Sequence, residues 1–371
     1  MDGHVLSLKI EESHRNILLM LCIFVLAGAF ASVAKALGGV EAMVDVSLWL
    51  LPSSLILVGL FVSSCLVSLS VGTSCGTIAA LTPIAAGMSS ETGYSVAMLT
   101  GVVVGGAFFG DNLSFISDTT IAASRTLGCR MRDKFVANLG IALPAAALCI
   151  VGYAVLLSHP DTSAVTSFDT ERLPLTIPYL FILICALFGM NVLLLLAAAL
   201  ILSISLGLVW GHSFHSLMLH AWSGVMGMGQ LILVTIIAAI AIEAVRRKGW
   251  LSRIVATLQH HATSQRAAEL SMAGLVTVAD ILTANNTIAI LSVGPFCKEM
   301  AERYHIDRRR AASILDTFSC TAQGFLPYGA QLLIAAGLAK LSPFAIIPHL
   351  HYPFVLGVAA LLYILLRKSD N

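Results

Sequence analysis

The sequence predicts an all-α polytopic membrane protein with inverted-topology repeats and discontinuous transmembrane helices, which are either broken or re-entrant. Three observations support this fold class. The 371 residues are 58% hydrophobic and only 11% charged, with a mean hydropathy of +0.91, whereas soluble domains carry about 25% charged residues. Several apolar segments are long enough to span a bilayer but are interrupted by polar residues. The interruptions fall at related places in the two halves of the chain.

Composition also narrows the classes of function. A net charge of +1 is no signature of nucleic-acid binding, so we expect no nucleic-acid partner. The eight Cys are scattered through apolar segments without any C-x-x-C pair, and no nucleophile–base pair or metal-ligand spacing is visible. We therefore expect no enzyme activity, no cofactor and no bound metal other than a transported ion.

The apolar segments follow one another along the whole chain. The segment 173–209 is too long for one helix, and we expect Gly189, Met190 and Asn191 to divide it into two spans. An amphipathic segment at 212–228 is expected to lie at the membrane interface. Further spans are expected at 16–37, 47–66, 135–157, 229–245 and 348–366.

Four other apolar segments carry polar breaks, which in a membrane protein require a reason. In 69–88 the break is 72–76, and in 94–124 it comprises Gly110-Asp111-Asn112 and Asp118-Thr119-Thr120. The second half repeats this arrangement. There 266–300 is broken at 283–286, and 311–341 is broken at 323–328.

Basic residues predict the orientation. Lys and Arg gather in 9–15, 125–134, 246–253, 298–310 and 367–368, and they are sparse in the loops between. Because basic loops stay in the cytoplasm, we expect a multi-pass protein of the bacterial inner membrane with both termini cytoplasmic and about twelve crossings.

The two halves resemble each other. A shift of 210 residues places 73–81 on 283–291 with five of nine residues identical, and corresponding loops differ in basic content, which indicates inverted halves. Inverted repeats with broken helices are typical of secondary transporters, whose binding site lies where the breaks meet. The expected organisation is a cytoplasmic tail (1–15), a first repeat (16–158), a connecting segment with about two transmembrane helices (159–228), a second repeat (229–366) and a C-terminal tail (367–371).

Broken helices offer carbonyl and side-chain oxygens to a hard cation such as Na⁺. Burial favours the protonated form of a carboxyl group and a bound cation favours the carboxylate, so one Asp can hold Na⁺ and H⁺ in turn. We assign proton and ion coupling to Asp111 and Asp118. The candidates for ion or substrate binding are Thr73, Ser74, Thr77, Asn112, Thr119, Asp280, Asn285, Asn286, Thr287 and Asp316.

Several of these residues have structural alternatives. Asp118 could cap the following helix. Asp280 and Asp316 could pair with Lys or Arg, or act as caps, and Asn285-Asn286 could form a polar turn. Lys35 and Glu243 lie near span ends, where we expect their side chains to reach the interface.

The breaks of the first half resemble a known family. The run 72–87, GTSCGTIAALTPIAAG, followed by 108–124, FFGDNLSFISDTTIAAS, is similar to the paired GTS-x-GT and GD-x-x-SPISDTT signature of NhaC-type Na⁺/H⁺ antiporters. The second-half runs ADILTANNTIAI and LDTFSCTAQGFLPYGAQ also resemble this family. Phe115 stands where the family commonly has Pro, and Asn112 stands where His is frequent. The resemblance covers 16–366 and implies an inner-membrane exchanger with broken and re-entrant helices.

The expected function is therefore exchange of Na⁺ for H⁺ by alternating access, with Na⁺, H⁺ and membrane lipids as partners and a homodimer as a candidate assembly. The alternative is a Na⁺- or H⁺-coupled transporter of organic acids or amino acids, since the resemblance extends to such members. No Arg near the breaks would clamp a carboxylate, although half-helix N-termini could bind one. A passive channel or a membrane scaffold is the third alternative.

Overall fold

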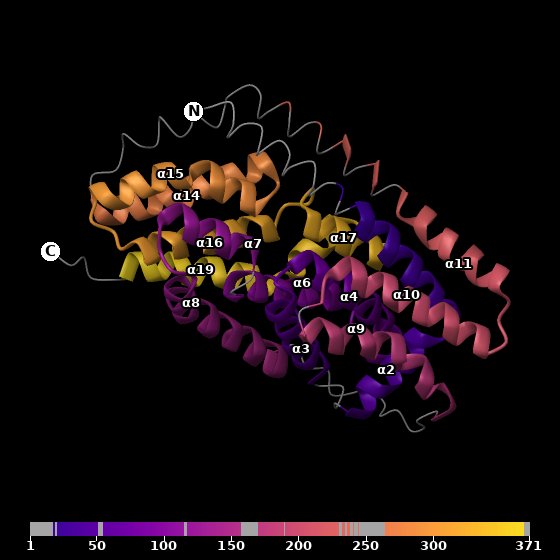
Figure 1. The fold of residues 1–371 in the computed structure, drawn as a ribbon. Coiled ribbons are helices and arrows are strands. Elements are labelled where there is room, and N and C mark those ends of the chain that lie inside the picture. Colours follow the sequence, from indigo (N-terminus) through magenta and orange to yellow (C-terminus); the bar gives the residue numbers. More distant parts are fainter. Residues whose placement is uncertain are drawn as a thin grey trace.

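The fold is a bundle of helices, seen in the computed structural model in Figure 1. The structure describes residues 21–50, 55–114, 117–156, 170–188, 190–229 and 264–366, with Leu18 and isolated positions between 232 and 244. Within these ranges it contains no β-strand. The span expected at 229–245 lies mostly outside the described residues. The polar stretch 159–169 lies wholly outside them.

The helices follow the apolar segments of the sequence. A first helix, Leu21–Ala36, precedes the labelled ones. These are α2 (Gly39–Leu50), α3 (Ile56–Val71), α4 (Ser74–Gly87), α5 (Ser89–Thr92), α6 (Val96–Leu113), α7 (Asp118–Leu127), α8 (Met131–Val151), α9 (Ile177–Leu187), α10 (Val192–Val209), α11 (Phe214–Gly227), α14 (Gln265–Thr283), α15 (Asn286–Arg303), α16 (Arg308–Gly324), α17 (Ala330–Ala339), α18 (Pro343–Ile346) and α19 (His351–Leu366).

Their lengths and composition suit a membrane. Three stretches found among the described helices are long and apolar enough to cross a bilayer, namely Met131–Val155, Val192–Val209 and Val96–Leu127, the last of which combines α6 and α7 and includes 115–116 outside the described residues. A fourth is possible if Ala330–Ala339 and Pro343–His349, bent by 94°, form one broken span. Four shorter apolar helices accompany them. The chain is thus an embedded helical protein, while the count of twelve crossings stays a prediction.

Both first breaks are confirmed. α3 ends at Gly72 in the left-handed region (φ 72°), Thr73 is extended, and α4 starts at once. In the second half Ala284 (φ 48°) and Asn285 occupy the same places between α14 and α15. A left-handed residue stops a helix by turning its last carbonyls away from the axis, so each break exposes backbone groups inside the bundle.

The second breaks are confirmed with changed bounds. Gly110, Asp111 and Asn112, expected as part of an interruption, belong to the last turn of α6, and the break follows at Ser114. The break expected at 323–328 separates α16 from α17. The division of 173–209 between α9 and α10 is also confirmed, and 212–228 forms α11.

The span predicted at 47–66 overlaps two helices. α2 covers 39–50, including residues expected as a loop, α3 begins at Ile56, and 51–54 lie outside the described residues. Gly38, at φ 82°, separates α2 from the preceding helix. The sequence did not predict α2 because 38–46 is only moderately apolar and carries Glu41 and Asp45.

The two halves agree at a shift of 212 residues, two more than the sequence identities indicated. At this shift α7 falls on α17, and the left-handed Gly72, Gly93 and Gly128 fall on Ala284, His305 and Lys340. The latter three are the non-glycine residues with positive φ in the described part of the chain. Pro83 of α4 likewise falls on Pro295 of α15. This recurrence of backbone conformations differs by two residues from the shift that the sequence identities indicated.

The helix that follows the first break of each half packs against a helix of the other half. α4 of the first half packs against α17 of the second, and α15 of the second packs against α7 of the first. The second contact belongs to a compact core of α7, α14, α15 and α16 (Figure 1). The first belongs to the larger core that contains α3, α4, α6 and α17.

Small residues bring α6 close to α3. A β-carbon at Gly110 would lie 2.3 Å from Ser68 Cβ, and one at Gly106 would lie 2.6 Å from Ser64 Cβ. The two Ser hydroxyls donate at 2.6 Å to backbone carbonyls of α6. Small-xxx-small spacing of this kind is how membrane helices approach closely. It fixes the C-terminal turn of α6 against the end of α3.

Candidate functional site

Asp111 lies where both halves meet. It occupies the last turn of α6 and is 5% exposed. Ser74 Oγ, at the start of α4, and Ser117 Oγ, before α7, each donate to its carboxylate at 2.8 Å. Asn286 Nδ2, at the start of α15, donates at 3.3 Å. We call Asp111 with Ser74, Ser117 and Asn286 the Asp111 centre; all its direct donors are neutral.

The second half encloses this centre with two amides. Gln331 Nε2 of α17 donates to Ser74 Oγ at 3.0 Å. Gln323 Nε2 of α16 donates to Gln331 Oε1 at 2.9 Å and to the carbonyl of Ala284 at 3.2 Å. A continuous hydrogen-bonded chain therefore runs from Asp111 to the break between α14 and α15.

Other predicted ligands surround the centre at greater remove. Thr119 Oγ1 bonds to the backbone carbonyl of Asp111 at 3.3 Å and to Ser117 Oγ at 2.8 Å. Thr77 Oγ1 donates to the carbonyl of Thr73, its neighbour one turn earlier. Asn285 Oδ1 accepts from the N–H of Ile288 and so caps α15, which is the polar-turn alternative. Thr287 is buried, and its N–H donates to Asn286 Oδ1.

Asp316 forms a second buried carboxylate, on α16. Lys134 Nζ of α8 lies 2.6 Å from Asp316 Oδ2, and both side chains are fully buried. Asn112 Nδ2 and Asn138 Nδ2 donate to the same oxygen at 2.9 and 2.8 Å. We call these four residues the Asp316 centre. Asn112, predicted as an ion ligand, thus points to Asp316, and Asp316 has the cationic partner that was the alternative to an ion-path role.

Lys134 also ties the break of the first half together. Its ammonium donates at 2.7 Å to the carbonyl of Asn112 at the end of α6 and at 2.7 Å to Thr120 Oγ1 in the first turn of α7. All three N–H groups of the ammonium are satisfied, which a buried charge requires. Lys134 therefore holds α6, α7 and α16 in one arrangement beside Asp111.

Asp280 is the third buried carboxyl. It lies one turn before the end of α14, is fully buried, and neither carboxyl oxygen has a hydrogen-bond partner. Gln323 Oε1 on α16 also lacks a hydrogen-bond partner among the described residues, and Tyr328 donates to the carbonyl of Ile281, the residue after Asp280. Within the described residues, the Asp280 carboxyl therefore forms no hydrogen bond to the Asp111 centre.

Asp118 differs from these three. It is exposed and is the first residue of α7. There its negative charge interacts favourably with the positive N-terminal end of the helix dipole. This role is similar to the capping role that was the alternative. The break does separate Asp111 from Asp118, as expected, and it leaves them in unlike surroundings.

Sequence reasoning missed five polar residues around the site. Lys134 was counted with a basic loop, although Lys134 and Asn138 are four residues apart on one face of an apolar helix, a pattern that could have revealed them. Gln323 and Gln331 flank the last break, and at a shift of 212 they fall on Asp111 and Thr119. Ser117 had no such signal. Arg310, also counted with a loop, is buried and pairs with Glu269.

Comparison with known proteins adds to this geometry. The profile of the Na⁺/H⁺ antiporter family matches residues 11–157 and 166–368, which is most of the chain. The Malate-2H(+)/Na(+)-lactate antiporter of Bacillus subtilis is 22% identical over 377 residues, covering 92% of this chain and 80% of that protein.

Two proteins of Haemophilus influenzae match shorter parts of the chain. An uncharacterised Na(+)/H(+) antiporter is 29% identical over 163 residues, which is 44% of this chain and 34% of that protein. An uncharacterised protein is 34% identical over 107 residues, which is 29% of this chain and 21% of that protein. The family profile and the Bacillus subtilis relative thus each match most of the chain.

Proposed function

The chain belongs to the Na⁺/H⁺ antiporter family, and we propose that it exchanges Na⁺ for H⁺ across the membrane by alternating access, with Asp111 as the group that binds the two cations in turn. The observation that carries this assignment is the composition of the Asp111 centre. Its carboxylate is buried at the meeting point of two breaks and has only neutral donors. A buried carboxylate without a cationic partner is unstable until it takes up a proton or a cation.

The neighbouring groups suit both occupants. Ser74 and Ser117 now donate to Asp111, and a hydroxyl can turn its oxygen toward a cation instead. Asn286 carries an amide oxygen, and Thr119 another hydroxyl, within the same cluster. Hard cations prefer oxygen ligands of this kind. When the carboxyl is protonated, the same hydroxyls can accept its hydrogen bond.

The two halves are inverted-topology repeats in this proposal, spanning 16–158 and 229–366 with 159–228 as the connection. The recurrence of left-handed residues at a shift of 212 supports it. So does the reciprocal packing of α4 on α17 and α15 on α7. Ser74 and Asn286 fall on each other at that shift and both donate to Asp111, which supports an ion position between equivalent helix starts.

We further propose that the protein resides in the bacterial plasma membrane with both termini in the cytoplasm. Removing the buried Lys134 and Arg310 from the basic loops leaves Arg125, Arg130 and Arg132 in one loop and four basic residues in 298–309. The positive-inside rule therefore still favours the same orientation. Na⁺, H⁺ and lipids are the proposed partners, a homodimer is the candidate assembly, and no cofactor or catalytic reaction is proposed.

A second candidate is a coupled exchange of organic acids. It is favoured by the similarity to a relative whose name includes malate and lactate. Uptake of labelled malate or lactate into vesicles, driven by a proton or Na⁺ gradient, would distinguish it from a pure cation exchanger.

The test uses purified protein in liposomes that contain a pH-sensitive dye. An imposed proton gradient should collapse on addition of NaCl in the wild-type protein and not in Asp111→Asn, because the amide binds neither H⁺ nor Na⁺ in the same way. Asp133→Asn is the matched control: it makes the same change at a surface carboxylate paired with Arg130. Wild-type exchange by Asp111→Asn, or absence of any Na⁺ response in the wild type, would contradict the proposal.

A further inference from the structure

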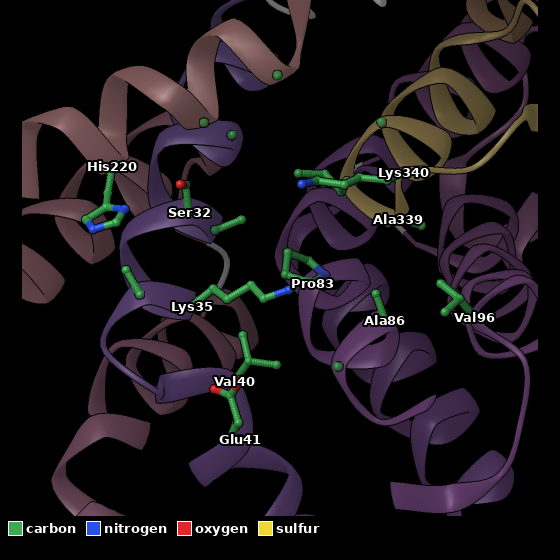
Figure 2. A pocket seen from close by; sticks show the side chains of 18 of the residues that line it. Ser32, Lys35, Val40, Glu41, Pro83, Ala86, Val96, His220, Ala339 and Lys340 are labelled. Atoms are coloured by element: carbon green, nitrogen blue, oxygen red, sulfur yellow. The ribbon is translucent and has the colours of Figure 1, made fainter. Parts of the chain in front are cut away.

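A large cavity lies away from the Asp111 centre. Its volume is about 870 Å³, within the range of about 300–1,000 Å³ typical of small-molecule pockets. The helix Leu21–Ala36, α2 and α11 form one wall, and the C-terminal ends of α4 and α17 form the other (Figure 2). The Asp111 centre contributes no lining residue.

Two ammonium groups extend into this cavity from opposite walls. Figure 2 shows Lys35 reaching across from the first helix and Lys340 from the end of α17. Within the described part of the chain, neither side chain forms a hydrogen bond or an ion pair. Lys340 sits at the 94° bend after α17 with φ 54°. Lys35, expected from the sequence to reach the interface, is exposed and points into this cavity.

The remaining lining indicates the class of ligand. The acidic groups facing the cavity are Glu41 and Asp45 of α2, and the other cation is Arg172; Asp45 and Arg172 already have partners. The charged lining residues sum to +1, which suits a singly charged anion better than a doubly charged phosphate. His220 and several Ser hydroxyls supply hydrogen-bonding groups, and the apolar lining suits a short carbon chain. The lining apolar residues include Ala31, Ala36, Val40, Pro83, Ala86 and Leu338.

From this arrangement we propose that the cavity is a second binding site, for a short-chain monocarboxylate held between Lys35 and Lys340. Carboxylate–ammonium contacts are charge-assisted hydrogen bonds, which are stronger than neutral ones. Binding here does not depend on the proposed role of Asp111.

The cavity is nevertheless connected to the ion site. α4 starts at Ser74 and α17 at Gly329, next to Gln331, whereas both helices end at the cavity. The two helices pack against each other along this path. Fourteen residues of α4 span roughly 20 Å. A carboxylate that draws Lys35 and Lys340 together would therefore fix the far ends of the helices that carry Ser74 and Gln331.

The experiment measures binding to the full-length protein in nanodiscs of neutral lipid. Sodium lactate, compared with sodium chloride at equal concentration, should raise the thermal unfolding temperature saturably. The double variant Lys35→Gln/Lys340→Gln should bind lactate at least about tenfold more weakly. Arg132→Gln, an exposed cation outside the cavity, is the matched control and should bind like the wild type. Lys35→Arg/Lys340→Arg should retain binding, which excludes misfolding as the cause of the loss.

Three outcomes would overturn the site. They are no saturable lactate effect, equal lactate binding by the double variant, or a Lys-dependent effect of phosphatidylglycerol nanodiscs without any effect of lactate, which would assign the cavity to a lipid headgroup. Asp111→Asn separates this proposal from the proposed function. That variant should lose exchange and keep lactate binding, so a failure of either proposal leaves the other measurable.

Discussion

Asp111 and Asp316 are two buried carboxylates in the candidate site, and they differ in the charge of their partners. Three neutral groups donate to Asp111, two hydroxyls and one amide. Asp316 has a fully buried ammonium at 2.6 Å and two amides on the same oxygen. Both carboxylates come from helices that end at a break, α6 and α16.

This difference indicates which carboxylate can exchange its partner. The cation of Asp316 is covalently part of the protein, so its charge is neutralised throughout a cycle. Asp111 has no such cation and must take one from solution. In the proposed exchange, the Asp316 centre would therefore be a scaffold, and the Asp111 centre the exchange site beside it.

The largest expected effect comes from removing the internal cation. Lys134→Met leaves Asp316 buried and unpaired, so the free energy of unfolding should fall by about 3–5 kcal/mol. Adding Asp316→Asn in the same chain should restore most of the lost free energy of unfolding, because the double variant no longer has an unpaired buried charge. Denaturant unfolding of the single and double variants measures both. Equal stability of Lys134→Met and wild type would remove the scaffold role.

The next effect is on the packing beneath Asp111. Gly110→Ala should destabilise the protein by about 1–3 kcal/mol and reduce exchange, since its β-carbon would overlap Ser68. Gly140→Ala on α8 is the control, because nothing lies within 4 Å of its β-carbon; it should be neutral or stabilising. The same unfolding and vesicle assays apply, and indistinguishable variants would show that the close contact is unimportant.

A smaller effect is expected at Asn286. Removing its amide in Asn286→Ala should raise the KM for Na⁺ by up to about tenfold while exchange remains. Because H⁺ and Na⁺ compete for Asp111, the KM of the wild type should also rise as pH falls. Initial rates of Na⁺-dependent dye response across a pH series test both. A KM independent of pH would argue against a shared carboxylate.

The smallest effect is expected at Asp118. Asp118→Asn should change exchange by less than about twofold, since the residue is exposed and contributes only to the start of α7. Vesicle assays beside Asp111→Asn make the comparison direct. Loss of exchange in Asp118→Asn would return this residue to the coupling role that its spacing from Asp111 suggested.

The sequence predicted the breaks well because interrupted apolar runs leave a local signal. Gly72-Thr73 and Ala284-Asn285 were located this way, as was Asp111. The backbone conformations recur at a shift of 212 residues instead of the 210 that the identities indicated, because Thr-Ile-Ala identities in regular helices are weak markers. The residues with positive φ define the shift of 212 between the two halves. They include Ala284, His305 and Lys340, whose residue types do not predict a positive φ.

The partners of the carboxylates could not be predicted. Lys134 and Asp316 are 182 positions apart, and only the tertiary packing of α8 on α16 brings them together. A basic residue at the start of an apolar segment reads as a loop charge under the positive-inside rule. That rule is statistical and says nothing about one buried Lys.

The reciprocal packing of α4 with α17 and of α7 with α15 also bears on how the protein is made. When a ribosome has produced the first half, α4 still lacks α17, and Ser74 lacks Gln331. Contacts so distant in sequence close slowly, and unfinished intermediates are prone to misassembly. The first half must therefore wait in the bilayer with an incomplete Asp111 centre until synthesis passes Ala339. Chains truncated before α17 should be degraded rather than accumulate as half-transporters.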